Sequence, residues 1–363
     1  MYRVCGFARL RATIPRMAVP ARFDDDPIAL SFRGPRGLRA VRFRSELAKR
    51  GDPLEFRRRG RSLTWELTVP RPVGVDRVEY LLELVHADGG SELVPDPANP
   101  LVAPGPFGDK SVLELPGYKR PVWIDEEAEP GTVEPLAVKS RLLRAEVTGL
   151  MWTSAGADGE STLPMLVVHD GPEYAELSAL THMLDTAVAQ LEVPPMRAAL
   201  LQPVRRNETY SAAKRYADAL ATEVVPGLPA TESRVGMGAS LGALAMLHAH
   251  RLHPELFAGL LLQSGSFFRR ELDGYERGFP RFERIARFVG GVRRTREWER
   301  PIPVTMTCGL GEENLGNNRA MRAALARQGY EVELVEHRDA HNWVSWRDVL
   351  EPHLTLLLER LWV

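Results

Sequence analysis

Cysteine and long apolar runs are the scarcest features of this 363-residue sequence. Its two cysteines, Cys5 and Cys308, are too few for a disulfide framework and fit a reducing compartment. No stretch approaches the roughly 20 consecutive apolar residues of a membrane span. The first residues, in which Met17 is an alternative start to Met1, lack the apolar core of a secretion signal. These absences predict a cytoplasmic protein.

Neither sign of charge is in excess. The formal net charge is -1, so no global field favours nucleic acid or an anionic membrane as a partner. The one basic run, RRRGR at residues 57–61, is more typical of a solvated hairpin tip than of a phosphate-binding patch. We therefore expect no nucleic acid and no membrane among the partners.

Strand-like patterns dominate the first third of the chain. Residues 63–69 alternate apolar and polar side chains, and a turn within residues 78–94 is typical of a hairpin. These patterns predict a small antiparallel β-sandwich over residues 26–120, preceded by a disordered extension over residues 1–25. An acidic stretch rich in proline and glycine predicts a linker over residues 121–138.

Strands alternate with helices in the remainder, residues 139–363. Some strands are continuous apolar runs, such as the MLVV sequence at residues 165–168, which is typical of strands buried on both faces of a parallel sheet. This alternation predicts a three-layer α/β domain, in which ligands bind at the carboxyl ends of the strands. The strands are expected near residues 146–152, 164–169, 198–204, 234–237, 259–263, 303–308 and 332–336.

The pentapeptide Gly238-Ala239-Ser240-Leu241-Gly242 lies where one of these strands must turn sharply into a helix. That context is the one a Gly-x-Ser-x-Gly nucleophile elbow requires, because the turn raises the serine hydroxyl above the sheet. The flanking glycines allow neighbouring backbone to approach closely. We expect Ser240 to be a nucleophile; the alternative is a purely structural turn.

Two later loops carry the partners that a serine nucleophile needs. A histidine must take its proton, and a carboxylate must orient that histidine. His341 is the expected base, whereas His337 is expected to be a surface loop residue. Glu312 is the expected orienting acid, with Glu313 and then Asp339 as alternatives. The order Ser, acid, His is that of the α/β-hydrolases, which is the fold class we expect for residues 139–363.

An oxyanion hole needs two N–H donors aimed at the developing charge. The backbone N–H of Leu241, directly after the nucleophile, is expected to be one. The other is expected from the loop at residues 169–174, where Pro172 has no N–H and Gly171 or Glu173 is therefore the candidate.

Several segments resemble the esterase D superfamily, in particular its enterochelin (ferric enterobactin) esterase-like branch. They are VHDG at residues 168–171, RRNE at 205–208, GMGASLGAL at 236–244, QSGSFF at 263–268 and AHNWVSWR at 340–347. The resemblance covers the second domain and extends more weakly into the first, at PDPANP (residues 95–100) and SVLELP (residues 111–116).

The resemblance implies Ser240 as nucleophile, His341 as base and Glu312 as acid. Candidate substrate contacts are Asp170, Tyr174, Arg205, Glu208 and Trp343. Arg205 and Glu208 match an Arg-x-x-Glu pattern of the family, although a local ion pair would explain them equally well. Departures from the family pattern, such as Asp339-Ala340 in place of Gly-Gly and Asn342 in place of Asp, mean that siderophore specificity does not follow.

The expected function is a serine esterase that hydrolyses carboxylic esters of small molecules through an acyl-enzyme, with no metal and no organic cofactor. Alternatives are a carbohydrate (feruloyl or acetyl) esterase, a siderophore trilactone esterase, an acyltransferase on the same triad, and a non-catalytic binding protein. Arginines and glutamates near the strand ends roughly cancel, which favours neutral or weakly charged esters. The arginines are Arg205, Arg206, Arg269, Arg270 and Arg338. The N-terminal domain is expected to cover the active site or to mediate homo-oligomer formation.

Overall fold

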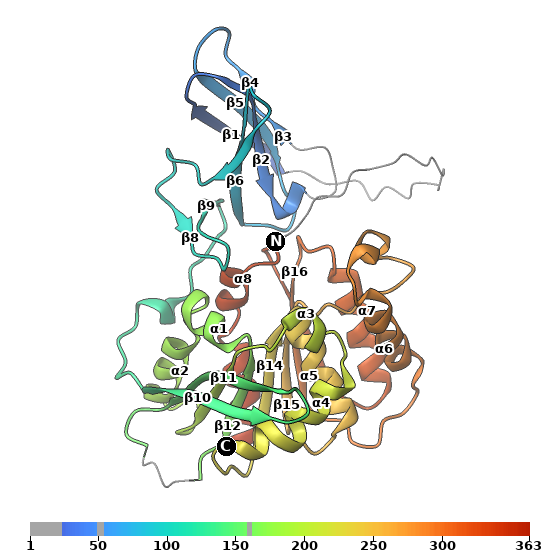
Figure 1. The fold of residues 1–363 in the computed structure, drawn as a ribbon. Coiled ribbons are helices and arrows are strands. Elements are labelled where there is room, and N and C mark those ends of the chain that lie inside the picture. The colour runs from blue at the N-terminus through green and yellow to red at the C-terminus, as the bar shows by residue number, and fades with distance from the viewer. Residues whose placement is uncertain (1–23, 49–53, 158–161) are drawn as a thin grey trace.

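The computed structural model describes residues 24–48, 54–157 and 162–363. The extension expected over residues 1–25, and Cys5 with it, lies almost wholly outside this range. Two antiparallel sheets form the N-terminal segment, by which we mean described residues 24–48 and 54–120 (Figure 1). One sheet has the order β1-β5-β4, and the other β3-β2-β6-β9-β8 with β7 paired to β6. The strands are β1 (Asp24–Arg33), β2 (Leu38–Ser45), β3 (Leu54–Glu55), β4 (Arg57–Arg58), β5 (Thr64–Arg71), β6 (Arg77–His86), β7 (Ser91–Val94), β8 (Val102–Ala103) and β9 (Lys110–Glu114).

These two sheets share one apolar core. The alternation expected at residues 63–69 is present, because Trp65, Leu67 and Val69 of β5 are buried while Glu66 and Thr68 between them are exposed. They cluster with apolar side chains of β6, including Tyr80 and Leu82. The hairpin expected at the basic run is confirmed, since β4 pairs with β5.

The larger sheet has eight strands in the order β10-β11-β13-β12-β14-β15-β16-β17. From β13 to β17 neighbouring strands are parallel, whereas β10 and β11 form an antiparallel hairpin at one edge. The strands are β10 (Thr132–Ser140), β11 (Ala145–Thr153), β12 (Met165–His169), β13 (Arg197–Leu201), β14 (Arg234–Ala239), β15 (Gly259–Gln263), β16 (Val304–Gly309) and β17 (Val332–His337). Each strand expected in this part is confirmed to within three residues, and so is the α/β class.

Helices cover both faces of this sheet. Met165 and Val167 of β12 belong to one apolar cluster with α4 to α7, whereas Leu166 and Val168 point to the other face and cluster with α1, α2, α8 and α9. The MLVV run is therefore apolar throughout because neither face is exposed to water. The helices are α1 (Gly171–Leu177), α2 (Leu180–Ala189), α3 (Arg206–Thr209), α4 (Lys214–Ala219), α5 (Leu241–Leu252), α6 (Phe282–Arg294), α7 (Leu315–Arg327), α8 (Trp343–Asp348) and α9 (His353–Trp362).

The segment expected to be a linker, residues 121–138, contains more regular structure than its composition indicated. Residues 122–125 form a 3-10 helix, and residues 132–138 form most of β10. The stretch without regular structure ends at Gly131, and the next residue, Thr132, already pairs with β11. The irregular stretch is therefore shorter than expected.

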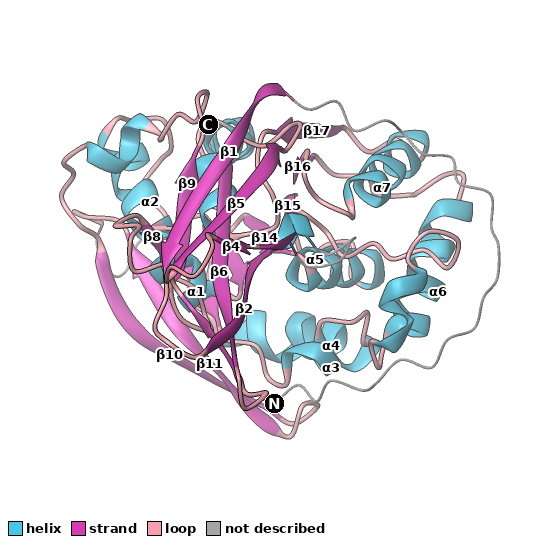
Figure 2. Cartoon of the chain, turned by 90° about the horizontal axis from the view of Figure 1, so that it is seen from above, coloured by secondary structure: helices cyan, strands magenta, loops and turns pink. Residues whose placement is uncertain are grey.

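The N-terminal segment lies over the carboxyl ends of the large sheet's strands (Figures 1 and 2). Asp76 forms an ion pair with Arg338, which follows β17, and Tyr118 donates a hydrogen bond to Asp348 at the end of α8. Ligand sites of parallel α/β sheets lie at this edge. Within the described residues, none of the helices has the length and apolar composition needed to cross a bilayer.

Gly238→Ala is expected to destabilise the fold, because a Cβ there would lie 2.7 Å from the carbonyl carbon of Gly242 in α5. We expect a loss of about 1–3 kcal/mol in the free energy of unfolding, measured by urea denaturation. The matched control is Gly291→Ala in α6, whose Cβ would meet no atom within 4 Å and which should stabilise the helix by up to about 1 kcal/mol. Equal effects of the two substitutions would contradict the close approach.

Candidate active site

Ser240 occupies a strained turn between β14 and α5. Its backbone angles are φ 56° and ψ -119°, a combination that non-glycine residues rarely adopt. The turn is held by the neighbouring strand, because the Ser240 N–H donates to the carbonyl of Gln263 at 2.9 Å and its carbonyl accepts from the Ser266 N–H at 3.1 Å. The hydroxyl is thereby directed away from the sheet, above its carboxyl edge.

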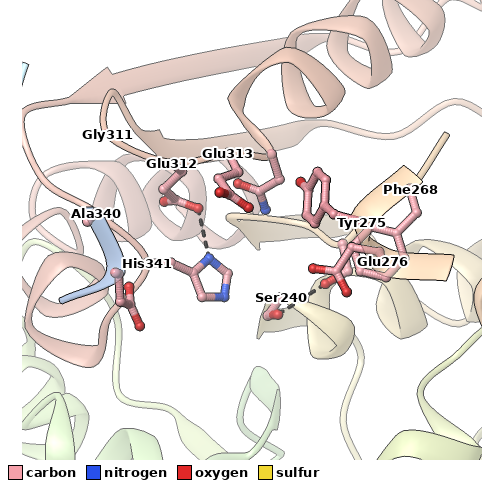
Figure 3. Close-up of a pocket in the computed structure, with 12 residues that line it drawn as sticks. Ser240, Phe268, Tyr275, Glu276, Gly311, Glu312, Glu313, Ala340 and His341 are labelled. Carbon is pink, nitrogen blue, oxygen red and sulfur yellow. Dashed lines mark hydrogen bonds and ion pairs between the residues drawn. The ribbon is translucent and has the colours of Figure 1, made fainter. Parts of the chain in front are cut away.

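His341 lies between Glu312 and Ser240 (Figure 3). Its Nδ1 is 2.8 Å from Oε2 of Glu312, which comes from the loop after β16. His341 itself comes from the loop after β17, and about a third of its side chain is exposed. The Nδ1 of the ring is therefore hydrogen-bonded to a carboxylate, and the opposite edge of the ring faces the cavity that contains Ser240.

Glu312 is a buried carboxylate whose partners keep it ionised. Its other oxygen accepts hydrogen bonds from the Ser264 hydroxyl at 2.6 Å and from the Gly309 N–H at 2.8 Å. Burial alone would raise the pKa of Glu312, but the charge of His341 and the hydrogen bonds from His341, Ser264 and Gly309 outweigh it and hold the pKa below its usual value. The indole N–H of Trp346 in turn donates to the Ser264 hydroxyl at 2.9 Å.

A cavity of about 160 Å³ opens beside Ser240 (Figure 3). The residues that line it are Glu46, Ser240, Ser266, Phe268, Tyr275, Glu276, Gly311, Glu312, Glu313, Asn314, Ala340 and His341. Glu46 belongs to the N-terminal segment, so that segment forms part of the wall. The Ser266 hydroxyl lies 3.1 Å from that of Ser240.

Ser264 and Ser266 are polar residues next to the proposed triad that the sequence analysis did not single out. Both lie just after β15, in the segment QSGSFF of residues 263–268. Their position after a parallel strand next to the elbow strand was the available signal, because such loops meet at one edge of the sheet.

The two expected oxyanion donors begin helices near the elbow. Leu241 starts α5, and Gly171 starts α1. The end of β12, two residues before Gly171, contacts the elbow, since Nδ1 of His169 is 3.0 Å from the carbonyl of Gly242. A Cβ on Gly171 would lie 2.2 Å from the Leu200 Cα, so only glycine fits there. Among the described residues, no group of three or more His, Cys, Asp or Glu side chains is arranged to hold a metal ion.

Proteins of similar sequence or fold include esterases of two kinds. No family model matches the chain. Among curated proteins, the iron(III) enterobactin esterase of Escherichia coli O6:H1 is 26% identical over 207 residues, covering 53% of this chain and 52% of that protein. The chain spans about half the length of the curated relatives it matches.

Solved structures extend the similarity over most of the fold. The enterobactin esterase of Shigella flexneri, crystallised in the presence of enterobactin, matches with a TM-score of 0.73 at 19% identity over 94% of each chain. A ferulic acid esterase matches with a TM-score of 0.53 at 16% identity, covering 63% of this chain and 98% of that one. The chain resembles the enterochelin esterases in sequence and in fold. The resemblance indicated by the sequence motifs is confirmed.

Two aromatic residues of this enterochelin esterase-like chain pack rather than line the cavity. Tyr174, expected as a substrate contact, is fully buried and its hydroxyl donates to the Gln263 side chain at 2.6 Å. That expectation is wrong, because the hydroxyl has a partner inside the core. Trp343 packs edge-on against Tyr174, at 5.2 Å between ring centroids, and against Trp346 at 4.9 Å. It does not line the cavity.

The remaining expected substrate contacts lie away from the cavity lining. Asp170 is buried and forms a two-point ion pair with Arg206, with both N–O distances 2.8 Å. Glu208 pairs with Arg284 at 3.0 Å and so links α3 to α6, which is a long-range ion pair and not the local one named as the alternative. Arg205 is exposed.

His337, at the end of β17, and Asp339, in the loop that carries His341, are structural residues. His337 is half-buried and has its Nε2 2.7 Å from the Ser345 hydroxyl, so it is not the surface loop residue expected. Burial lowers the pKa of His337 to about 4. Asp339 is buried and accepts hydrogen bonds from the Ala340 N–H and the Asn342 side chain. Burial raises the pKa of Asp339 to about 7, against the opposing effects of Arg77 and these hydrogen bonds.

Asp339→Asn is expected to stabilise the protein more at pH 7 than at pH 5. The folded pKa lies above the unfolded value, so Asp339 favours folding when protonated, and this contribution is lost as the pH rises from about 4 to 7. Asparagine mimics the protonated acid at every pH. The difference in unfolding free energy between variant and wild type should grow by roughly 1–3 kcal/mol between pH 5 and 7. A difference that does not change with pH would contradict the raised pKa.

Proposed function

We propose that this chain is a serine esterase that hydrolyses carboxylic esters through an acyl-enzyme on Ser240. The observation that carries the proposal is the convergence of Ser240, His341 and Glu312, from three separate strand-end loops, on one cavity. The sequence similarity to iron(III) enterobactin esterases supports ester hydrolysis as the reaction class.

In this mechanism His341 acts as general base. Because its Nδ1–H is held by the Glu312 carboxylate, Nε2 is the nitrogen that accepts the Ser240 proton. The Ser240 oxygen attacks the ester carbonyl, and the charged imidazole is stabilised by Glu312. Collapse of the tetrahedral intermediate transfers the proton to the leaving alcohol. Water activated by His341 then releases the acid and regenerates Ser240.

Charge develops on the carbonyl oxygen during attack. We assign its stabilisation to the backbone N–H of Leu241, at the positive end of α5, together with the N–H of Gly171. No metal or organic cofactor has a step in this mechanism.

The proposed architecture is an α/β-hydrolase domain preceded by a β-sandwich over residues 26–120. The pairing of β10 with β11 argues that the catalytic domain begins near Thr132 rather than at residue 139. Glu46 supports a role of the sandwich in covering the active site, because it lines the same cavity as Ser240 and His341.

Two substrate classes are favoured by particular relatives. Siderophore esters are favoured by the enterobactin esterases, and feruloyl esters by the ferulic acid esterase. None of the five arginines counted near the strand ends lines the cavity, and Arg206, Arg270 and Arg338 pair with carboxylates. This placement still favours neutral or weakly charged esters over a triply anionic ferric catecholate.

Ser240→Ala tests the function directly. We expect kcat for p-nitrophenyl esters to fall by about a thousandfold or more, with the fold intact, because only the attacking hydroxyl is removed. A fluorophosphonate probe should label the wild type and not the variant. Assaying feruloyl sugars and a ferric catecholate trilactone in the same panel separates the substrate classes. A variant that keeps more than about a hundredth of wild-type kcat would overturn the assignment.

Glu312→Gln and Glu313→Gln form a matched pair that tests the orienting acid. Glu312→Gln replaces the carboxylate that lies 2.8 Å from His341, so kcat should fall by about 10²–10⁴-fold. Glu313→Gln removes a carboxylate charge one residue further along the chain, and its kcat should fall far less. Similar losses in steady-state kcat would mean that the charge of the cavity, rather than the orientation of His341, is what matters.

A further inference from the structure

The loop that carries His341 also contacts the N-terminal segment. It spans residues 338–342, between β17 and α8. Residues 74–77, at the start of β6, lie against it. A general base must be held within a fraction of an ångström of its working position, so the contacts that hold this loop bear on catalysis.

The first contact is a three-point attachment three residues before His341. Arg338 donates from Nε to Oδ2 of Asp76 at 2.7 Å and from its terminal nitrogen to Oδ1 at 2.9 Å. The Asp76 N–H also donates to the Arg338 carbonyl at 3.0 Å. Asp76 is itself buried, and its carbonyl accepts a hydrogen bond from the Leu115 N–H at 2.8 Å. Asp76 is therefore held by the N-terminal segment while it binds Arg338.

The second contact lies directly after His341. The buried guanidinium of Arg77 donates to the side-chain oxygen of Asn342 at 3.3 Å and pairs with Glu79 at 2.9 Å. The same oxygen of Asn342 accepts from the Ser345 N–H at 2.8 Å and so caps α8. The two contacts thus flank His341 on both sides along the chain.

The loop that carries Glu312 also contacts residues 74–77 of the N-terminal segment. A Cβ on Gly311 would lie 2.6 Å from a methyl carbon of Val75, and a Cβ on Gly74 would lie 2.9 Å from the Leu310 Cβ. The Gly311 N–H donates to the Asp339 carbonyl at 3.0 Å, which joins the two loops to each other. Residues 74–77 therefore support the loops of both the acid and the base.

We propose that Asp76 and Arg77 of the N-terminal segment are positioning residues, which hold His341 in line with Glu312 and Ser240. The proposal rests on the triad of the proposed function and assigns the N-terminal segment a part in catalysis beyond covering the cavity. Docking of this segment on the His341 loop is then required for full activity. A purely stabilising interface would change the unfolding free energy and leave the chemistry of folded molecules unaltered.

The test compares Asp76→Asn with Glu83→Gln in the full chain. Glu83 lies in β6, is similarly buried and pairs with Arg44 at 2.7 Å, but belongs to no contact with the His341 loop. For Asp76→Asn we expect kcat per fluorophosphonate-titrated site to fall about tenfold, with KM for a small p-nitrophenyl ester nearly unchanged. The acid limb of its pH profile should move to lower pH, because His341 loses part of its contact with Glu312. Glu83→Gln should match the wild type in both measurements.

Arg338→Gln provides a second route to the same contact, from a side chain that is about half exposed and so easily replaced. The double variant should lose no more kcat than Asp76→Asn alone, because all three variants break the same Asp76–Arg338 ion pair. The proposal is overturned if Asp76→Asn and Arg338→Gln lower the melting temperature but leave kcat and the acid limb of the pH–rate profile the same as in Glu83→Gln. A wild type that neither hydrolyses esters nor reacts with the probe would instead overturn the proposed function, and this inference with it.

Discussion

The site depends on one buried charge. The Glu312 side chain is only 1% exposed, and an isolated carboxylate in such a place would take up a proton. It remains ionised because His341, Ser264 and the Gly309 N–H all face it. Ser264 and His341 come from the loops after β15 and β17, and Gly309 ends β16, so the bonds to this carboxylate join the ends of three neighbouring strands.

The elbow supplies the other half of the geometry. Ser240 keeps its unusual backbone angles because hydrogen bonds to Gln263 and Ser266 fasten the turn to the neighbouring strand. Gly238 and Gly242 are in close backbone contact, which lets α5 begin directly behind the serine. The hydroxyl and the imidazole are thus supported by different parts of one sheet, and the N-terminal segment adds a third support through Asp76 and Arg77.

Several features of the site could be predicted because they are local. The strand–turn–helix pattern around Ser240 and the positions of Glu312 and His341 after strands follow from short stretches of sequence. Tyr174 and Glu208 could not be placed in the same way. Tyr174 looks like a surface loop residue beside the active site, yet its ring enters the core and bonds Gln263, 89 residues away. Glu208 meets Arg284, 76 residues away, through the packing of α3 on α6.

The sequence by itself determined the alternation of strands and helices, the apolar character of strands covered on both faces, and the elbow. These depend on side-chain periodicity and on the backbone freedom of glycine, which are properties of neighbouring residues. Only the tertiary structure decided that Glu312 faces His341, that Ser264 and Trp346 complete its surroundings, and that Asp76 reaches Arg338 across 262 positions. Such contacts depend on strand order, on register and on the direction of each loop, and differences of a single residue redirect a side chain to another face.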